Sequence, residues 1–504
     1  MLRHLSAISE ARGTAMGDEI WREERLLIDG RLVAAAEGGV YDNVNPASEE
    51  VLGVAADATT ADMDAAIAAA RRAFDETTWS TDVDQRVRGL RQLHAALVAH
   101  QEELRLTTVA EGGTPVALTY GAQLDMPIDG IEWAADLATS YEWVEDLGDA
   151  KPFGIRSHRY VRREPVGVVG AITPWNFPVQ INLAKLAPAL AAGNTVVLKP
   201  APDTPWTALL IGRLIAEETD IPEGVVNIVS SAGHDVGQQL AEDPRVDLVT
   251  FTGSTATGRR VMVAAAGNLK KVFLELGGKS AALALEDADV ADAAASTAIQ
   301  IMTHAGQGCA ITTRLLLPRS KYDEGLEVLV ATMGAVGYGD PMEPSNLMGP
   351  LISARQRERV LGMIEQGVAE GATVALGGGR PAHLPVGYYV EPTVLTDVAP
   401  DATVAQEEIF GPVLVVQAYD TEDEAVALAN NSAYGLSGAV FSGSIEHARA
   451  VAGRLRTGTV SLNGGLWYGP DVPFGGYKQS GIGREMGRAG FEEYLETKAI
   501  GEPA

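Results

Sequence analysis

Cys309 is the only cysteine in the 504-residue chain, and it lies between a glycine and an alanine in the segment GQGCA. A lone cysteine is most often a small buried hydrophobic residue. This segment, however, is too poor in apolar side chains for ordinary core. A reactive thiolate needs nearby positive charge or helix dipoles, and small neighbours let a substrate approach the sulfur. Cys309 is therefore a candidate nucleophile.

Two further polar residues follow runs typical of strands. Glu275 lies between two leucines in LELGGKS (274–280). Because an unpaired buried carboxylate is costly, Glu275 either pairs with Lys271 or Lys279, or has a raised pKa and activates a water. Asn176 lies in PWNFP (174–178). It is either a turn residue or an amide that donates to an oxyanion.

Three segments have residue types that could bind a dinucleotide. FTGSTATG (251–258) is expected to open a helix at Thr255 and so to present backbone N–H groups to a phosphate, although it lacks G-x-G-x-x-G. Lys199, in NTVVLKP, is either a surface lysine or a contact to ribose or phosphate. Glu408 and Phe410, in EEIFGPV, either bind a ribose diol and flank a flat ring, or only shape a turn.

The elements that must position these residues follow from apolar periodicity. Residues 62–110 have stripes of helical period. Short apolar runs then alternate with helical segments and predict a parallel sheet with helices on both faces; the runs are 166–172, 194–200, 225–230, 247–253 and 271–276. Ligands of such sheets bind beyond the carboxyl ends of the strands. A second α/β region spans 277–467, and the basic run GIRSHRYVRREP (154–165) predicts a projecting hairpin.

Composition excludes several classes of protein. The net charge of −28 disfavours nucleic acid and anionic lipid as partners, and no apolar run is long enough for a membrane span. A single cysteine cannot form an internal disulfide, so we expect a cytoplasmic protein. Residues 1–24 contain Glu10, Asp18 and Glu19, which favour a disordered extension over a transit peptide.

The motifs PWNFP, LKP, FTGST, LELGGKS, GQ-x-C, EEIFGPV and PFGGYKQSGIGRE occur in this order, and together they closely resemble the aldehyde dehydrogenase superfamily from about residue 25 onward. The resemblance implies an α/β fold with a Rossmann-type parallel-sheet cofactor domain, an α/β catalytic domain and a β-hairpin oligomerisation arm. The implied limits are 25–146 with 167–276 for the dinucleotide-binding domain, 277–467 for the catalytic domain, and 147–166 with 468–504 for the arm and C-terminal segment. A homodimer or homotetramer is also implied.

The resemblance further implies oxidation of an aldehyde to its acid through a cysteine thioester, with hydride transfer to NAD(P). Cys309 matches the nucleophile, Glu275 the general base, Asn176 the oxyanion donor and Lys185 a proton-relay residue. The implied cofactor contacts are Ile172, Thr173, Pro174, Trp175, Lys199, Gly233, Phe251, Gly253, Ser254, Leu276, Glu408 and Phe410. The implied substrate contacts are Phe177, Leu466, Trp467 and Tyr468, and no metal is implied.

One departure concerns the cofactor. Many NAD-preferring members have a glutamate three residues after the lysine of LKP, whereas this chain has Pro202 there, followed by Asp203. A proline accepts no ribose hydrogen bond, but Asp203 would repel a 2′-phosphate, so NAD is expected and NADP is the alternative.

The substrate is expected to be a hydrophobic or aromatic aldehyde. Gly308, Ala310 and Ala184 are small and suggest a roomy tunnel beside the sulfur. The rival interpretations are a semialdehyde dehydrogenase of the same mechanism, a coenzyme-A-acylating enzyme, and a non-catalytic binding or structural protein that retains the fold.

Overall fold

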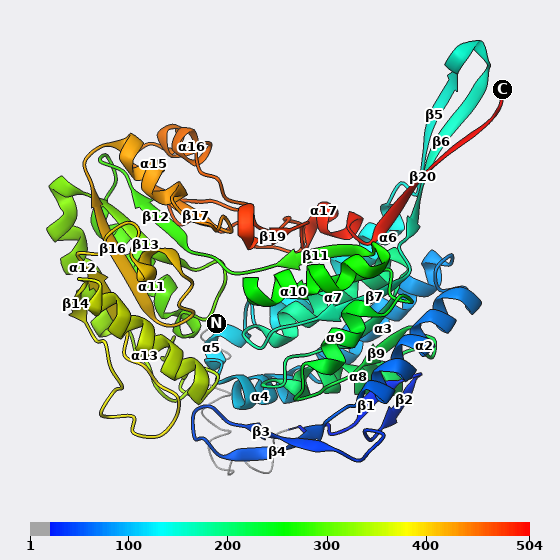
Figure 1. Cartoon of the computed structure of the whole chain (residues 1–504), viewed down its shortest axis with the longest axis horizontal. Coiled ribbons are helices and arrows are strands. Elements are labelled where there is room, and N and C mark those ends of the chain that lie inside the picture. Colours follow the sequence, from blue (N-terminus) through cyan, green and yellow to red (C-terminus); the bar gives the residue numbers. More distant parts are fainter. Residues whose placement is uncertain (1–20) are drawn as a thin grey trace.

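In the computed structural model, which describes residues 21–504, two sheets of mainly parallel strands form two α/β bodies, and a long hairpin projects from one of them (Figure 1). This arrangement confirms the predicted fold class. The described helices include none that is long and apolar enough to cross a lipid bilayer.

The first sheet has the strand order β19-β11-β10-β7-β8-β9-β1-β2. Strands β9, β8, β7, β10 and β11 pair in parallel, as the alternating apolar runs predicted, while β1, β2 and β19 pair antiparallel at the two edges. The strands are β1 (Leu26–Ile28), β2 (Arg31–Val33), β7 (Val168–Ile172), β8 (Thr195–Lys199), β9 (Val226–Ile228), β10 (Leu248–Thr252), β11 (Lys271–Glu275) and β19 (Gly481–Ile482).

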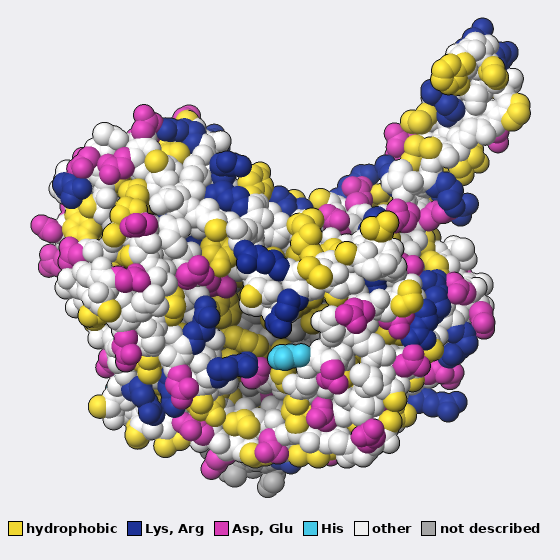
Figure 2. Space-filling model, viewed as in Figure 1, with side chains coloured by type: hydrophobic (Ala, Val, Ile, Leu, Met, Phe, Trp, Pro, Cys, Tyr) yellow, Lys and Arg dark blue, Asp and Glu magenta, His cyan; other side chains and the backbone are white. Residues whose placement is uncertain are grey.

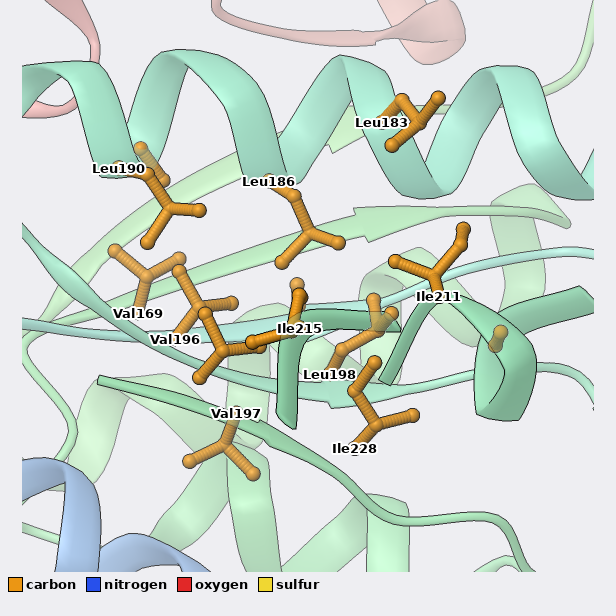
Figure 3. Close-up of a cluster of buried hydrophobic side chains, with 14 of the residues drawn as sticks. Val169, Leu183, Leu186, Leu190, Val196, Val197, Leu198, Ile211, Ile215 and Ile228 are labelled. Carbon is orange, nitrogen blue, oxygen red and sulfur yellow. The ribbon is translucent and has the colours of Figure 1, made fainter. Parts of the chain in front are cut away.

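Helices cover both faces of this sheet, and they bury its apolar strands (Figure 1). Leu186 and Leu190 of α7 point toward Val169 and Val196 of the sheet, and Leu183 points toward Ile211 of α8 (Figure 3). Each such buried aliphatic side chain contributes about 1.5–3 kcal/mol. The helices of this body are α2 (Thr60–Glu76), α3 (Val83–Ala99), α4 (Gln101–Gly112), α5 (Val116–Thr119), α6 (Asp125–Ser140), α7 (Pro178–Ala192), α8 (Pro205–Glu218), α9 (Asp235–Glu242), α10 (Thr255–Ala265) and α17 (Gly487–Glu492).

The second sheet has the order β14-β15-β16-β13-β12-β17-β18. Its strands are β12 (Ser280–Ala284), β13 (Thr312–Pro318), β14 (Thr373–Leu376), β15 (Thr393–Thr396), β16 (Val413–Tyr419), β17 (Gly438–Phe441) and β18 (Ser461–Leu462). Its helices are α11 (Val290–Met302), α12 (Tyr322–Ala335), α13 (Ala354–Ala369), α14 (Thr403–Gln406), α15 (Glu422–Asn430) and α16 (Ile445–Ala452). The sequence did not predict β14 and β15.

The arm consists of β5 (Val144–Ala150), β6 (Ser157–Pro165) and β20 (Leu495–Pro503), and β6 lies in the centre. The basic run contains β6, one strand of a projecting hairpin whose other strand, β5, precedes the run (Figure 1). The predicted projection is confirmed. The hairpin begins before residue 147, where the predicted limit fell. The C-terminal segment also does more than join the arm, because β19 extends the first sheet beside β11, and Phe491 and Tyr494 enter its core.

Two N-terminal hairpins and the chain start were not predicted correctly. The pairs β1–β2 and β3 (Val40–Val44) with β4 (Val51–Ala56) lie where no strand was expected. The predicted disordered extension spans residues 1–24, of which 1–20 lie outside the described part. For residues 21–24 the prediction is wrong, because Trp21 stacks on His100 at 4.9 Å between ring centroids and Glu23 is buried.

A buried carboxylate caps helix α8 from another helix. Thr204, which precedes α8, makes no side-chain cap hydrogen bond. Instead Glu111 of α4 accepts hydrogen bonds from the backbone N–H groups of Trp206 and Thr207, each at 2.9 Å, and from Asn43 Nδ2 at 2.9 Å. Burial raises the pKa of Glu111 to about 7 in spite of these bonds. The cap therefore fixes the helix that follows the Lys199 loop.

Replacement of this carboxylate should destabilise the protein measurably. The change Glu111→Gln places an amide N–H against backbone N–H groups that need an acceptor, so we expect the free energy of unfolding to fall by about 1–3 kcal/mol. Denaturant titration at pH 8 measures it. The matched control is Glu370→Gln, because the exposed Glu370 also accepts a backbone N–H, from Thr403 at 2.7 Å; a change within about 0.5 kcal/mol is expected there. Equal losses in both variants would contradict the prediction.

Candidate active site

The candidate nucleophile follows an unusual turn at the end of α11. His304, Ala305 and Gly306 have φ angles of 50°, 54° and 69°, in the left-handed region that non-glycine residues rarely adopt. At Gly306 a Cβ atom would lie 2.1 Å from the carbonyl oxygen of Gly411, so only glycine fits. The turn is thereby held against the EEIFGPV segment, and Cys309 lies three residues beyond it.

The buried side chain of Gln307 holds this loop against residues 350–352. Its Nε2 donates to the carbonyl oxygen of Pro350 at 3.2 Å, and its Oε1 accepts from the backbone N–H of Ile352 at 3.0 Å. Asn176 Nδ2 in turn donates to the Gln307 carbonyl oxygen at 2.8 Å. An amide nitrogen carries two N–H groups, so Asn176 keeps one for a substrate oxygen.

Two glycines of LELGGKS let three of the predicted site residues approach one another. A Cβ at Gly277 would lie 2.4 Å from Glu408 Oε2, and a Cβ at Gly278 would lie 2.6 Å from the Cys309 carbonyl oxygen. Glu408 Oε1 also accepts the backbone N–H of Gly278 at 2.8 Å, and burial raises its pKa to about 7. The segment that carries Glu275 thus passes between Cys309 and Glu408.

Glu275 is buried, and neither of its carboxylate oxygens has a hydrogen-bond partner among residues 21–504. Burial raises its pKa well above the ordinary value, and the Glu485 carboxylate adds to this. The alternative that Glu275 pairs with a neighbouring lysine is wrong, because Lys271 bonds to Glu496 and the Lys279 ammonium has no hydrogen bond within the described chain. An unpaired buried carboxylate is typical of a functional site.

Glu485 is a site residue to which the sequence assigned no role. Its Oε1 lies 2.9 Å from the Nζ of Lys185, and both side chains are buried. Lys185 also donates to Thr250 Oγ1 at 2.9 Å and lies over the ring of Phe273. The predicted proton-relay lysine thus reaches the site through Glu485. The motif GIGRE contains this glutamate, but its local sequence carries no signal of burial.

Cys309 opens into a cavity of about 220 Å³ between the two bodies. Five predicted residues line it: Asn176, Phe177, Cys309, Trp467 and Tyr468. Further lining residues that were not predicted include Gln180, Ile181, Gln300, Ile311, Phe474 and Glu485. Leu466 does not line it, because its side chain is 98% exposed, and the expectation of a substrate contact finds no geometric basis.

A second, smaller cavity continues the first between α6 and α7. The two cavities share Gln180 and Tyr468, and Ala184 lines the second one. Trp467 stacks on Phe474 with ring centroids 5.5 Å apart. The space beyond the sulfur is therefore an apolar, aromatic-walled tunnel, and the small side chain of Ala184 keeps its outer part open.

The predicted cofactor contacts of the first sheet lie along one edge. Strand register pairs Ile172 with both Lys199 and Phe251, and Thr252 with Glu275, so the carboxyl ends of four strands are level. The loops that follow these strands carry Thr173, Pro174, Trp175, Gly253, Ser254 and Leu276, and Gly233 lies in the loop after β9.

This edge has the groups that a dinucleotide requires. Ser254 caps α10, whose N-terminal N–H groups suit a phosphate. Lys199 donates to the Ser231 carbonyl oxygen at 3.1 Å, and burial lowers its pKa to about 8. Across the cleft, Phe410 meets Trp175 edge to face at 5.4 Å between ring centroids. The residues present therefore fit NAD.

The thiol of Cys309 is surrounded by carboxylates. Burial raises its pKa, and Glu275 adds to the increase, followed by Glu408 and Glu485. Among the described residues, no cluster of three or more His, Cys, Asp and Glu side chains could hold a metal ion.

Alkylation of the thiol tests whether the neighbouring carboxylates raise the pKa of Cys309. One equivalent of iodoacetamide per subunit should abolish activity, and the rate should increase as the pH rises because the thiolate is the nucleophile. The change Glu275→Gln removes a nearby carboxylate, lowers the pKa of Cys309 and should raise the alkylation rate at pH 9 by about threefold or more. With Glu370→Gln as the control, an unchanged rate is expected. A slower reaction in Glu275→Gln would contradict the assigned cause.

A thiol and an amide donor line one cavity, and the unpaired Glu275 carboxylate is close enough to raise the pKa of that thiol. Groups of these types are typical of enzymes that form a covalent intermediate on cysteine. The model of the aldehyde dehydrogenase family matches residues 33–500, and this chain belongs to that family.

A 3-succinoylsemialdehyde-pyridine dehydrogenase from Pseudomonas sp is 45% identical over 476 residues, which cover 94% of this chain and 97% of that protein. The crystal structure of betaine aldehyde dehydrogenase from Staphylococcus aureus in complex with NAD+ has a TM-score of 0.92 at 38% identity, with 95% of this chain and 94% of that chain covered. An NAD+ complex of aldehyde dehydrogenase from Bacillus cereus has a TM-score of 0.91 at 40% identity, with 95% and 96% covered.

Proposed function

We propose that this enzyme oxidises neutral hydrophobic or aromatic aldehydes to carboxylic acids, with NAD as the hydride acceptor and a thioester on Cys309 as the intermediate. The observation that carries the proposal is the apolar cavity in which Cys309, Asn176 and Phe177 meet, beside the unpaired carboxylate of Glu275.

The chain's own groups can perform the acyl steps. The Cys309 thiol gives its proton to water, its sulfur attacks the aldehyde carbon, and the new oxyanion accepts the free N–H of Asn176 and the backbone N–H of Cys309. NAD, when bound, supplies the hydride acceptor at this stage. Glu275 then removes a proton from water, which attacks the thioester carbonyl; the carboxylic acid leaves and the thiolate is restored.

Protons from this reaction need a route out of the buried site. The raised pKa of Glu275 suits it to accept a proton near neutral pH. Glu485 raises that pKa through its negative charge and is itself bound to Lys185 at 2.9 Å. We therefore assign Glu485 and Lys185 to proton transfer away from Glu275.

The lining supports a neutral, apolar substrate. Within the described chain, Glu485 is the only charged side chain that lines either cavity, and its charge is balanced by Lys185. A phosphorylated or carboxylate-bearing aldehyde would find no cation there. The Pseudomonas relative is named for a semialdehyde of pyridine, which supports an aromatic group and keeps aryl semialdehydes within the proposed class.

The loop after β8, which contains Pro202 and Asp203, supports NAD over NADP. Asp203 follows Pro202 in this loop, and burial raises the pKa of Asp203 while the positive charges of Arg355 and Lys199 oppose the shift. A carboxylate at this point disfavours a second phosphate. Two related structures are NAD+ complexes, which is consistent with this choice.

The arm supports a homodimer or homotetramer. Phe153 and Ile155 at its end are 103% and 71% exposed, and Leu147 is 48% exposed. Figure 2 shows apolar side chains on the surface of the projecting arm. Apolar side chains on a projecting hairpin are costly in water, and a second copy of the chain would cover them.

The single cysteine is consistent with the cytoplasm as the predicted location.

A substrate panel with both cofactors tests the proposal. We expect kcat/KM for octanal and benzaldehyde to exceed that for glyceraldehyde 3-phosphate at least about tenfold, with higher values for NAD than for NADP. The product should be the free acid with or without coenzyme A. A preference for the phosphorylated aldehyde would overturn the substrate class, and acyl-coenzyme A as the product would overturn hydrolysis by Glu275.

A further inference from the structure

One amide in the wall of the Cys309 cavity has a fixed orientation. Gln300 lies on α11 and lines the cavity. Its Oε1 accepts the backbone N–H of Thr312 at 3.2 Å, and it also accepts the Thr312 hydroxyl. A backbone N–H can only donate, so the atom that faces it must be the amide oxygen. The Nε2 group therefore points away from Thr312.

This Nε2 group is an unused donor. It has no hydrogen-bond partner among residues 21–504, whereas the other glutamine of the lining, Gln180, bonds to Tyr468. The amide of Asn176 is held beside Cys309 by its bond to Gln307, so it serves the reacting oxygen. Gln300 thus presents a second donor to the cavity, carried by a different element from the one that bears Asn176.

The charge of the surroundings decides what this donor can bind. The Gln300 oxygen already accepts two hydrogen bonds, so a substrate group must accept rather than donate. An anionic acceptor is disfavoured, because no lysine or arginine of the described chain lines the cavity and the charged Glu485 does. A neutral acceptor, such as a ketone oxygen or an aromatic ring nitrogen, fits this donor.

We infer that Gln300 is a specificity-determining residue that donates a hydrogen bond to a neutral acceptor in the tail of the substrate. The enzyme therefore prefers aryl or alkyl aldehydes with a ketone or ring nitrogen to hydrocarbon aldehydes of the same shape. This inference rests on the proposed function, since it concerns the tail of the aldehyde that Cys309 attacks.

The test compares two aldehydes that differ in one group, 4-oxo-4-phenylbutanal and 4-phenylbutanal, together with the analogue that carries the ketone at carbon 5. Gln300 lines the cavity but is exposed, so water competes for its amide, and we expect the wild-type enzyme to prefer one keto aldehyde by about three- to tenfold in kcat/KM. In Gln300→Glu, which keeps an acceptor for Thr312, and in Gln300→Met, this ratio should fall to about one.

The matched control is Gln85→Glu on α3, whose side-chain oxygen likewise accepts a threonine hydroxyl, from Thr78 at 3.0 Å, outside both cavities. It should keep the wild-type ratio. A wild-type ratio of one for both keto aldehydes, or a preference that survives in both Gln300 variants, would overturn the inference while leaving aldehyde oxidation intact. Failure of the wild-type enzyme to oxidise any of the three aldehydes would overturn the proposed substrate class and the inference with it.

Discussion

Replacement of Cys309 by alanine is expected to lower kcat for aldehyde-dependent NADH formation by about 10⁴-fold or more, because the proposed covalent intermediate forms on its sulfur. Cys309 is the only cysteine, so no neighbouring thiol can take its place. The measurement is NADH absorbance under saturating benzaldehyde and NAD, with the wild-type enzyme alongside.

The same variant separates chemistry from binding. Within the described chain, the Cys309 side chain makes no hydrogen bond to a predicted cofactor contact. Glu408, for example, accepts the backbone N–H of Gly278 at 2.8 Å. NAD affinity, measured by fluorescence titration, should therefore stay within about twofold of wild type. Thiol titration of the unfolded variant should find no reactive sulfur. Turnover above about one hundredth of the wild-type rate would contradict covalent catalysis by Cys309.

Replacement of Glu275 by glutamine is expected to lower steady-state kcat by about 10²–10⁴-fold, the contribution typical of a general base. The first turnover should survive, because attack by Cys309 and hydride transfer precede the step that needs the base. Stopped-flow absorbance should therefore show one equivalent of NADH per active site, followed by a slow phase. Mass spectrometry of the quenched enzyme should find the acyl group on Cys309.

The pH dependence follows from the raised pKa of Glu275. The active form of a general base is the carboxylate, so kcat of the wild-type enzyme should fall as the pH drops through this raised value, well above the pH at which an exposed glutamate titrates. In Glu275→Gln this acid limb should disappear. Hydroxylamine, a nucleophile that needs no base, should restore release of the acyl group. A variant without a burst, or one with the wild-type acid limb, would contradict the role of Glu275.

Local sequence left the role of Glu275 undecided, since lysines at positions 271 and 279 could have paired with it. The fold excludes such a pair, because Lys271 points to the C-terminal strand and bonds to Glu496, while Gly475 lies against the Glu275 carboxylate. Which partner a carboxylate meets depends on strand register and on segments 200 residues away, such as 475 beside 275. The residues next to Glu275 in the sequence therefore cannot show which groups its carboxylate meets.

Residues without a sequence signal were missed for the same reason. Glu485 and Gln300 are ordinary polar residues in their own segments. Glu485 reaches the cavity because β19, which precedes it, joins the first sheet beside β11. Gln300 reaches the cavity because it lies on α11, the helix that leads into the turn before Cys309. Leu466 shows the opposite error, since its neighbour Trp467 faces the cavity while Leu466 itself faces solvent.

The amino-acid sequence by itself indicated the α/β class, the parallel pairing of the apolar strands and Cys309 as a candidate nucleophile, since apolar periodicity and the unusual segment GQGCA are local properties of the chain. The tertiary structure alone decided which groups meet around Cys309. The level carboxyl ends of β7, β8, β10 and β11, the glycines at 277 and 278, and the buried Gln307 bring distant segments within contact distance. Close packing fixes such contacts to fractions of an ångström, and that precision lies in the assembled fold rather than in any single segment.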